Sequence, residues 1–276
     1  MTQRSGQDLS GVAETLLITL YIRALESQRH DALLKDEQAV TLVRRIDQDF
    51  LRNALVKIDP ETQVAVILRN RQFDFYIRDF LARFPEAVVV HIGCGFDSRF
   101  ERVVERNSKV EWYDLDLPEV IDLRRRFIGD EKERYHLLAC SVLDSKWLDA
   151  VSAHRERPFL FLAEGVLMYL KESQLKPLVL TLQEKFPGAE LVFDAFSPFF
   201  VWANNRRVAR TKIGALCYWA LKRGKELESW GDGICLLDEW FPFEQSEPRL
   251  GKARWVRGIP LFARTVGVFR YRLEIA

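Results

Sequence analysis

The sequence has few of the residues that build metal centres or disulfide frameworks. Its 276 residues include four cysteines and four histidines, and no cysteine pair has CxxC spacing. Zinc sites and disulfide scaffolds need such clustered spacings, so we predict no metal site. The cysteines are expected to be reduced, mostly buried thiols, as in a cytoplasmic protein.

Long apolar runs and an excess of one charge sign are also missing. No run approaches the roughly 20 residues that a transmembrane helix requires, and the first residues, MTQRSGQDLSGVAET, lack the apolar core of a signal peptide. The chain has 41 lysines and arginines against 40 aspartates and glutamates. This balance predicts neither nucleic acid nor an anionic membrane as a partner.

The hydrophobic fraction of 48% predicts a globular chain, and the length suits one large α/β domain or a domain with a helical addition; we take the chain as one structural domain overall. Apolar residues recur at helical spacing in three N-terminal stretches, residues 12–28, 36–46 and 63–83. The helical pattern ends near Pro85. We therefore divide the chain into an N-terminal helical region, 1–84, and a core, 85–276.

The core alternates short apolar runs with helical stretches. The predicted strands are 87–93, 110–116, 134–140, 158–165 and 189–196, and the predicted helices between them are 97–106, 118–128, 145–152 and 172–186. This alternation is typical of βαβ units and a parallel sheet. A helix over 198–223 and a last strand over 266–275 complete the prediction.

A glycine turn follows the first predicted strand. Ligands of open parallel sheets bind at the carboxyl ends of the strands, and Gly93 and Gly95 would let the backbone approach a ligand closely. A dinucleotide site prefers a third glycine where Ser98 stands, and Asp97 adds a charge that disfavours a pyrophosphate. The turn favours a ligand with a cationic amino group, such as S-adenosylmethionine, over NAD.

Acids end two other predicted strands. Asp114 or Asp116 lies about 20 residues past the glycines, the distance expected of an acid that binds ribose hydroxyls. Asp116 could instead cap the helix that follows. Glu164 interrupts an apolar run at the end of the fourth strand, so we expect it either to face the cleft or to be a paired structural acid.

The third predicted strand ends in ACSVLD. Ser141 and Val142 would lie beside the end of the second strand, where an adenine would bind. Ser141 could equally cap a turn.

Seven segments, taken in order, resemble the leucine carboxyl methyltransferase family, in particular its bacterial branch of polyketide-biosynthesis O-methyltransferases. The segments are ETLLITLYIRALE, LRNRQFD, VVHIGCGFDSRF, VEWYDLDLPEVIDLRRRF, LLACSVLD, FLAEGVLMYL and LVFDAFSP. The resemblance implies a class I, Rossmann-like α/β fold. Its mostly parallel seven-stranded sheet would have helices on both faces and an N-terminal helical lid, residues 12–60 or so. It also implies an S-adenosylmethionine-dependent O-methyltransferase.

The resemblance assigns roles to matching residues. Arg69 corresponds to the arginine that pairs with the methionyl carboxylate, and the two glycines correspond to the turn against the methionyl part. Asp116 corresponds to the family's ribose acid, while Asp114 replaces its glutamate. Glu164 corresponds to the acid of the family's A-E-x-V-L-x-Y pattern.

One departure and one further match complete the correspondence with the family. Ser141 replaces an aspartate that lies near the adenine in eukaryotic members, although Val142 could still offer backbone groups. Tyr169 corresponds to the tyrosine of the A-E-x-V-L-x-Y pattern.

The methyl acceptor is less defined. A carboxylate, with a pKa of about 3.3–4.3, needs no general base, whereas a phenol near 10 benefits from one. No histidine lies in a base motif, which favours a small carboxylic acid over a phenol. Tyr169 and Arg207 are substrate-side candidates, although Arg207 could belong to a solvated helix face. The catalytic residue itself stays unassigned.

Three alternatives remain at this point. The chain could be a nucleotide-dependent oxidoreductase, a non-catalytic S-adenosylmethionine-binding protein, or a methyltransferase for the C-terminal carboxylate of a protein.

Overall fold

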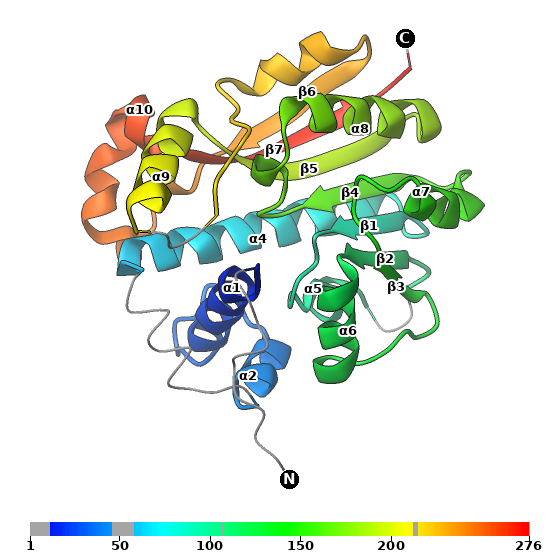
Figure 1. Ribbon diagram of the computed structural model, residues 1–276. Helices are drawn as coiled ribbons and strands as arrows, with labels where there is room; N and C mark the ends of the chain where they lie inside the picture. Colours follow the sequence, from blue (N-terminus) through cyan, green and yellow to red (C-terminus); the bar gives the residue numbers. More distant parts are fainter. Residues whose placement is uncertain (1–11, 46–57, 106–107, 212–214, 276) are drawn as a thin grey trace.

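The computed structural model describes residues 12–45, 58–105, 108–211 and 215–275. One sheet runs through the molecule in the strand order β3-β2-β1-β4-β5-β7-β6 (Figure 1). Its strands are β1 (Val88–Ile92), β2 (Glu111–Asp116), β3 (Tyr135–Ala139), β4 (Phe159–Ala163), β5 (Ala189–Phe196), β6 (Ile234–Trp240) and β7 (Val266–Leu273). The first five strands pair in parallel, and β7 is antiparallel to both of its neighbours. The predicted seven-stranded, mostly parallel sheet is confirmed.

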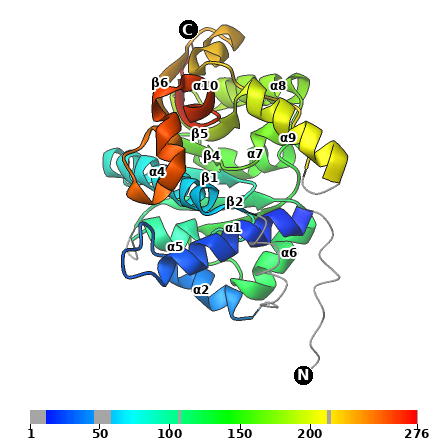
Figure 2. The same cartoon turned by 90° about the vertical axis from the view of Figure 1, so that its left-hand side faces the viewer.

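Helices cover both faces of this sheet (Figures 1 and 2). The helices are α1 (Val12–Ser27), α2 (Glu37–Val43), α4 (Pro60–Arg83), α5 (Arg99–Val103), α6 (Pro118–Phe127), α7 (Lys146–Val151), α8 (Glu172–Lys185), α9 (Pro198–Thr211) and α10 (Pro260–Ala263). Every residue of β1 and β4 is buried, because side chains alternate between the two covered faces. Val88 packs with α7 and α8 on one face, and Val89 packs with α4, α5 and α6 on the other.

The long helix α4 is fixed to the sheet by its apolar residues. It begins where Asp59 accepts a hydrogen bond from the Thr62 amide and Pro60 takes the first helical position. Phe73, Ile77 and other apolar residues of α4 pack with the sheet in a common buried cluster. This packing places the middle of α4 beside the carboxyl ends of β4 and β5, where Arg69 contacts their last acidic residues.

The structure corrects two predictions after β5. Helix α9 ends at Thr211, whereas we predicted a helix to residue 223, of which 212–214 lie outside the described residues. The Asn205 side chain binds both the amide and the carbonyl of Cys217, which holds that segment against α9 instead of continuing the helix. Strand β6 was not predicted, because as an edge strand it is largely exposed and lacks clean apolar alternation.

Within the described residues, no helix is both long enough and apolar enough to cross a membrane.

Candidate functional site

The glycine turn joins β1 to α5 and is held against the end of β2. The amide of Gly93 donates to the Leu115 carbonyl at 2.7 Å, and the amide of Gly95 donates to Asp116 Oδ2 at 2.8 Å. Both glycines have positive φ, 66° and 50°. A Cβ on Gly93 would overlap the Val166 side chain, and one on Gly95 would lie 2.7 Å from Leu16 Cδ2. The turn therefore requires glycine for both conformation and space.

We expect Gly93→Ala to weaken cofactor binding at least tenfold and to lower stability by about 1–3 kcal/mol, because alanine is strained at this φ and displaces Val166. Calorimetry with S-adenosylhomocysteine and thermal unfolding measure the two effects. The matched control is Gly129→Ala, at a positive φ with no atom within 4 Å of the added Cβ. Equal affinity losses in both variants would contradict a special role for Gly93.

Asp116 ends β2 beside this turn, as predicted. Its carboxylate accepts hydrogen bonds from the amides of Gly95 and Leu117, both at 2.8 Å. Burial raises the pKa of Asp116, although these two amides oppose the rise. A carboxylate has about four acceptor positions, so two amides leave it able to accept hydroxyls of a ligand.

The end of β3 adjoins Asp116, whose carbonyl accepts the Cys140 amide at 3.0 Å. Ser141 Oγ accepts the Leu143 amide at 3.2 Å, and the Val142 carbonyl accepts Trp147 Nε1 at 3.0 Å. The structure thus brings Ser141 and Val142 to the same edge of the sheet as Asp116. The Ser141 side chain also stabilises the turn in which it lies.

Asp114 is not open to a ligand, which differs from its predicted role. Its side chain is buried, and it accepts hydrogen bonds from Trp112 Nε1 at 2.8 Å, Arg124 Nη2 at 2.5 Å and the Tyr135 hydroxyl at 2.6 Å. Burial alone would raise the pKa of Asp114, but Arg124, His91 and Tyr135 together lower it. The contacts make Asp114 an anchor between β2, β3 and α6.

The ends of β4 and β5 carry two buried acids that share one arginine. Glu164 Oε1 accepts from Arg69 Nε and Asn70 Nδ2, each at 3.0 Å. Asp194 accepts from Arg69 Nη1 at 2.7 Å and from the Gly165 amide at 2.6 Å. Burial raises the pKa of Asp194 despite the nearby Arg69.

Arg99 connects these acids to the glycine turn. Its guanidinium is fully buried, with Nε 2.9 Å from Asp74 Oδ1 and Nη2 2.5 Å from Glu164 Oε2. Burial alone would raise the pKa of Glu164, but Arg99 and Arg69 lower it. Arg99 also lies 3.1 Å from Asp97. Glu164 is therefore ionised and fixed in orientation at neutral pH.

Asp97 does not present a free carboxylate to the cleft. Its oxygens face Arg99 at 3.1 Å and Arg102 at 2.9 Å, and these cations overcome burial and hold its pKa well below the usual range. The predicted contact with an ammonium would have to compete with both arginines. Asp97 acts in the structure as a link between the glycine turn and α5.

The N-terminal helices are tied to the same network through Asp36. Its carboxylate contacts Arg23 at 2.9 Å, Ser98 Oγ at 2.5 Å and Arg102 at 3.0 Å. Arg23 also donates to the Phe96 carbonyl at 2.8 Å, inside the glycine turn. The position of α1 is therefore coupled to the conformation of the turn.

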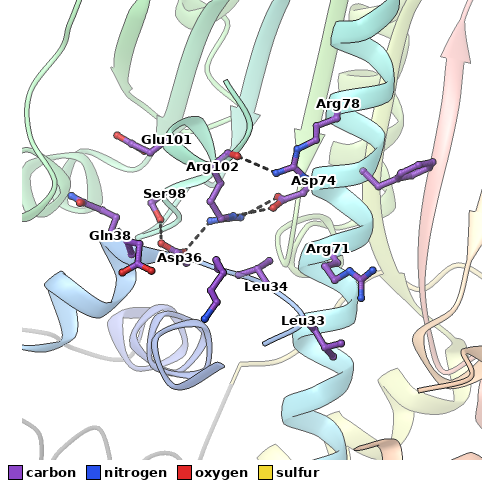
Figure 3. Close-up of a pocket in the computed structure, with 13 residues that line it drawn as sticks. Leu33, Leu34, Asp36, Gln38, Arg71, Asp74, Arg78, Ser98, Glu101 and Arg102 are labelled. Atoms are coloured by element: carbon purple, nitrogen blue, oxygen red, sulfur yellow. Dashed lines mark hydrogen bonds and ion pairs between the residues drawn. The ribbon is translucent and has the colours of Figure 1, made fainter. Parts of the chain in front are cut away.

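A half-open cavity of about 650 Å³ lies between the start of α2, α4 and α5. Figure 3 shows Arg102 between Asp36 and Asp74 in its wall. None of the predicted cofactor residues lines this cavity, so it is separate from the predicted cofactor site. The cavity wall is connected to that site only by the network of ion pairs in which Arg102 takes part.

Sequence reasoning missed several members of this network. Asp194 could have been found, since it interrupts the apolar run LVFDAF as Glu164 interrupts FLAEG. Asn70, Asp74, Arg99 and Arg102 carried no such signal, because pattern alone does not show which charges on separate elements will meet.

The two substrate-side candidates, Tyr169 and Arg207, lie in different surroundings. Tyr169 ends the short helix η3 (Leu167–Tyr169) near Asp194 and Arg69, which both affect its ionisation. Tyr169 is 37% exposed, and partial desolvation of its hydroxyl raises its pKa to about 12. Arg207 is exposed on α9, where it donates to Asn204, and within the described residues no ion pair brings it together with the acids.

Comparison with known proteins decides the family. Residues 16–183 match the family described as leucine carboxyl methyltransferase. The chain belongs to this family. It is an S-adenosylmethionine-dependent O-methyltransferase, which replaces the oxidoreductase alternative.

Two relatives match over most of both chains. The tetracenomycin polyketide synthesis O-methyltransferase TcmP of Streptomyces glaucescens is 35% identical over 95% of this methyltransferase and 97% of its own length. The S-adenosyl-L-methionine-dependent methyltransferase dpfgK of Gibberella zeae is 30% identical, over 92% of this chain and 89% of its own. Leucine carboxyl methyltransferase 1 of Caenorhabditis elegans is 27% identical over 46% of this chain and 47% of its own.

Solved structures support the fold. A putative methyltransferase from Thermobifida fusca superimposes with a TM-score of 0.57 at 16% identity, covering 92% of this methyltransferase and 94% of its own chain. A DUF574 family protein from Streptomyces avermitilis gives 0.55, also at 16% identity, covering 94% and 96%. The class I, Rossmann-like architecture is thereby confirmed.

Proposed function

We propose that this methyltransferase transfers the methyl group of S-adenosylmethionine to a carboxylate, or to a phenolic hydroxyl, of a small molecule. The observation that carries the proposal is the similarity to TcmP over nearly the whole of both chains, since that relative is named for small-molecule biosynthesis. The relative named for leucine carboxyl methylation matches less than half of this chain. A protein acceptor is therefore the second candidate.

The residues at the strand ends fit the cofactor. Gly93 and Gly95 carry no side chain of their own, although Val166 and Leu16 lie against them, and Asp116 keeps acceptor positions for ribose hydroxyls. Ser141 and Val142 would flank the adenine, while Arg69, Glu164 and Asp97 would surround the methionyl end. When bound, the sulfonium supplies an electrophilic methyl group. The remaining task of the protein is to hold and align the acceptor.

The contacts of the histidines favour a carboxylate acceptor. His91 is buried 3.4 Å from Asp114, His136 lies 3.0 Å from Glu111, and His154 lies beside Tyr113. His30 is exposed next to Asp31. None of the four contacts Glu164, Asp194 or Tyr169 in the part of the chain that the structure describes. A carboxylate needs no such base, since it is ionised at neutral pH.

Tyr169 would orient the acceptor rather than deprotonate it. Its pKa of about 12 keeps the phenol protonated, so it can donate a hydrogen bond to a carboxylate oxygen. Arg69 lies near Tyr169 but is paired with Glu164 and Asp194, so Tyr169 is the group that we propose to contact the acceptor.

We further propose that α1 and α2 are the lid within the predicted N-terminal region, 1–84, over a core formed by 85–276. Leu16 of α1 lies directly over Gly95, and Arg23 binds the turn, so the cofactor cannot reach this turn without movement of α1. Residues 46–57 of the predicted lid lie outside the described residues.

Hydrogen exchange in α1 should slow when S-adenosylhomocysteine binds, and unchanged exchange would refute the lid.

The first experiment is isothermal calorimetry with S-adenosylmethionine and S-adenosylhomocysteine, with NAD as the control. We expect binding of the first two and none of NAD.

Arg69→Ala should weaken the binding of S-adenosylmethionine more than the binding of adenosine, because only the former has a carboxylate to pair with. Equal losses would contradict the role proposed for Arg69.

The acceptor class is tested by a screen of aromatic and aliphatic acids and phenols with methyl-labelled cofactor. A methyl ester releases labelled methanol in mild base, whereas a methyl ether does not, so the same assay separates the two products. We expect base-labile label. Base-stable label would assign a phenol, and label in protein alone would overturn the small-molecule proposal.

A further inference from the structure

The overall charge balance conceals a strongly basic surface at one end of the molecule. Helix α9 and residues 248–264, which include α10, contain no aspartate or glutamate. The rings of Phe199 and Phe262 lie 5.9 Å apart in an edge contact, which joins the two segments into one surface. Figures 1 and 2 show both segments at the end of the molecule opposite α7. We call this surface the basic aromatic face.

Several cations of this face have no acidic partner among the residues that the structure describes. Arg249 pairs with Glu26, and Arg264 pairs with Glu239 and Glu244. No ion pair within the described residues involves the other cations of the face, which are Arg206, Arg207, Arg210, Lys252, Arg254 and Arg257. Glu61 lies beside Gly251 and Glu247 immediately precedes the segment, so they offset part of this charge, but the six cations outnumber them and leave the face positive.

Large apolar side chains project from the same face. Trp255 is 86% exposed, and Leu261 and Trp202 are more than half exposed. Phe199, Ile259 and Phe262 are also exposed. Exposed apolar clusters of this kind on a soluble protein mark an interaction site.

The combination indicates an anionic lipid surface. We propose that the basic aromatic face attaches the enzyme peripherally to membranes that contain anionic phospholipids. In the segment KARWVRGIPLFAR, apolar residues that can enter the headgroup boundary are interspersed with cations that can meet lipid phosphates. The inference does not depend on which acceptor is methylated.

Other occupants fit less well. A second copy of the chain, related by a two-fold axis, would place the same cations against each other. Nucleic acid would match the cations and could stack on Trp255, but Ile259 and Leu261 offer no stacking surface. An acidic protein would also match the charge of the face. Because vesicles of pure lipid contain no protein, binding to them separates a lipid partner from an acidic protein partner.

The test is co-sedimentation with vesicles of equimolar phosphatidylglycerol and phosphatidylcholine, and with vesicles of phosphatidylcholine alone. We expect the protein to bind the first kind with a blue shift of tryptophan fluorescence, and not the second. Raising the salt concentration from about 0.1 M to about 1 M should release it, because the Debye length falls from about 10 Å to about 3 Å.

Two variants locate the contact. Lys252→Glu/Arg254→Glu should lower vesicle affinity more than about twentyfold, since each basic residue near the surface contributes roughly fivefold. Trp255→Ser/Leu261→Ser should reduce binding and abolish most of the blue shift. The matched control, Lys146→Glu/Arg155→Glu, reverses two exposed charges near α7, at the opposite end, and should bind as the parent does.

The proposal is overturned if the parent protein fails to bind anionic vesicles, or binds neutral ones equally well. It is also overturned if the control loses as much affinity as Lys252→Glu/Arg254→Glu. Binding of single-stranded DNA without binding of vesicles would assign the face to nucleic acid instead. Circular dichroism checks that each variant is folded, and the result for the parent decides the question even if a variant is not.

Discussion

Replacing Arg99 by methionine should lower the free energy of unfolding by about 3–5 kcal/mol, the usual cost of breaking a buried ion pair. The guanidinium of Arg99 is fully buried and faces Asp74, Asp97 and Glu164. Methionine keeps much of the length of the side chain but leaves these carboxylates with less compensating charge. Denaturant unfolding, followed by circular dichroism, measures the loss.

An exposed arginine provides the control for this prediction. Arg125 pairs with Asp122 and Asp130 at the surface, so Arg125→Met should cost no more than about 1 kcal/mol. Adding Asp74→Asn to Arg99→Met should recover part of the loss, because it removes one of the under-compensated acids. A cost below about 1 kcal/mol for Arg99→Met would show that the network is not a major source of stability.

The variant Asp116→Asn should weaken S-adenosylhomocysteine binding by roughly 5- to 150-fold, equivalent to about 1–3 kcal/mol for lost hydrogen bonds to a charged acceptor. The amide can accept at only one atom, whereas the carboxylate already binds two backbone amides and has positions left for ribose hydroxyls. Calorimetry measures the change. Asp122→Asn, the same substitution at an exposed acid of α6, is the control. Unchanged affinity in Asp116→Asn would remove Asp116 from the site.

The affinity should also depend on pH through the same residue. Burial raises the pKa of Asp116, and only its ionised form accepts hydrogen bonds at both oxygens. Affinity should therefore fall as the pH falls through this raised pKa, by up to tenfold per pH unit below it. Asp97 and Glu164 have lowered pKa values and stay ionised in this range. Calorimetry at a series of pH values descending from neutral should show the decline in the parent but not in Asp116→Asn.

The architecture was predictable because its signals are local. A strand buried on both faces must be apolar throughout, and VVVHI and FLFLA show this directly. The glycine turn was also visible, because its positive φ values restrict the residue type. Strand β6 escaped prediction because an exposed edge imposes no such constraint.

Within the site, the sequence determined which residue types stand at the strand ends, and the family resemblance supplied their roles. Only the tertiary structure separated Asp114 from Asp116, which lie two residues apart on one strand. Arg124 on the packed helix α6 and Tyr135 on β3 occupy the first carboxylate, while the second meets the glycine turn. The environment of a charge depends on which elements pack around it, and the spacing along the chain does not contain that information.

The same reason explains the surface and the network. The composition shows a balanced charge because it is a sum over the whole chain. In the folded protein α9 packs beside α10, and cations and aromatic rings therefore lie together on one face. Arg99 and Glu164 are 65 residues apart in sequence and meet only when the sheet brings β4 next to β1. The sequence by itself determined the elements, the glycine turn and the chemical types at the strand ends. The tertiary structure decided which charges neutralise each other and which remain available to a ligand or a membrane.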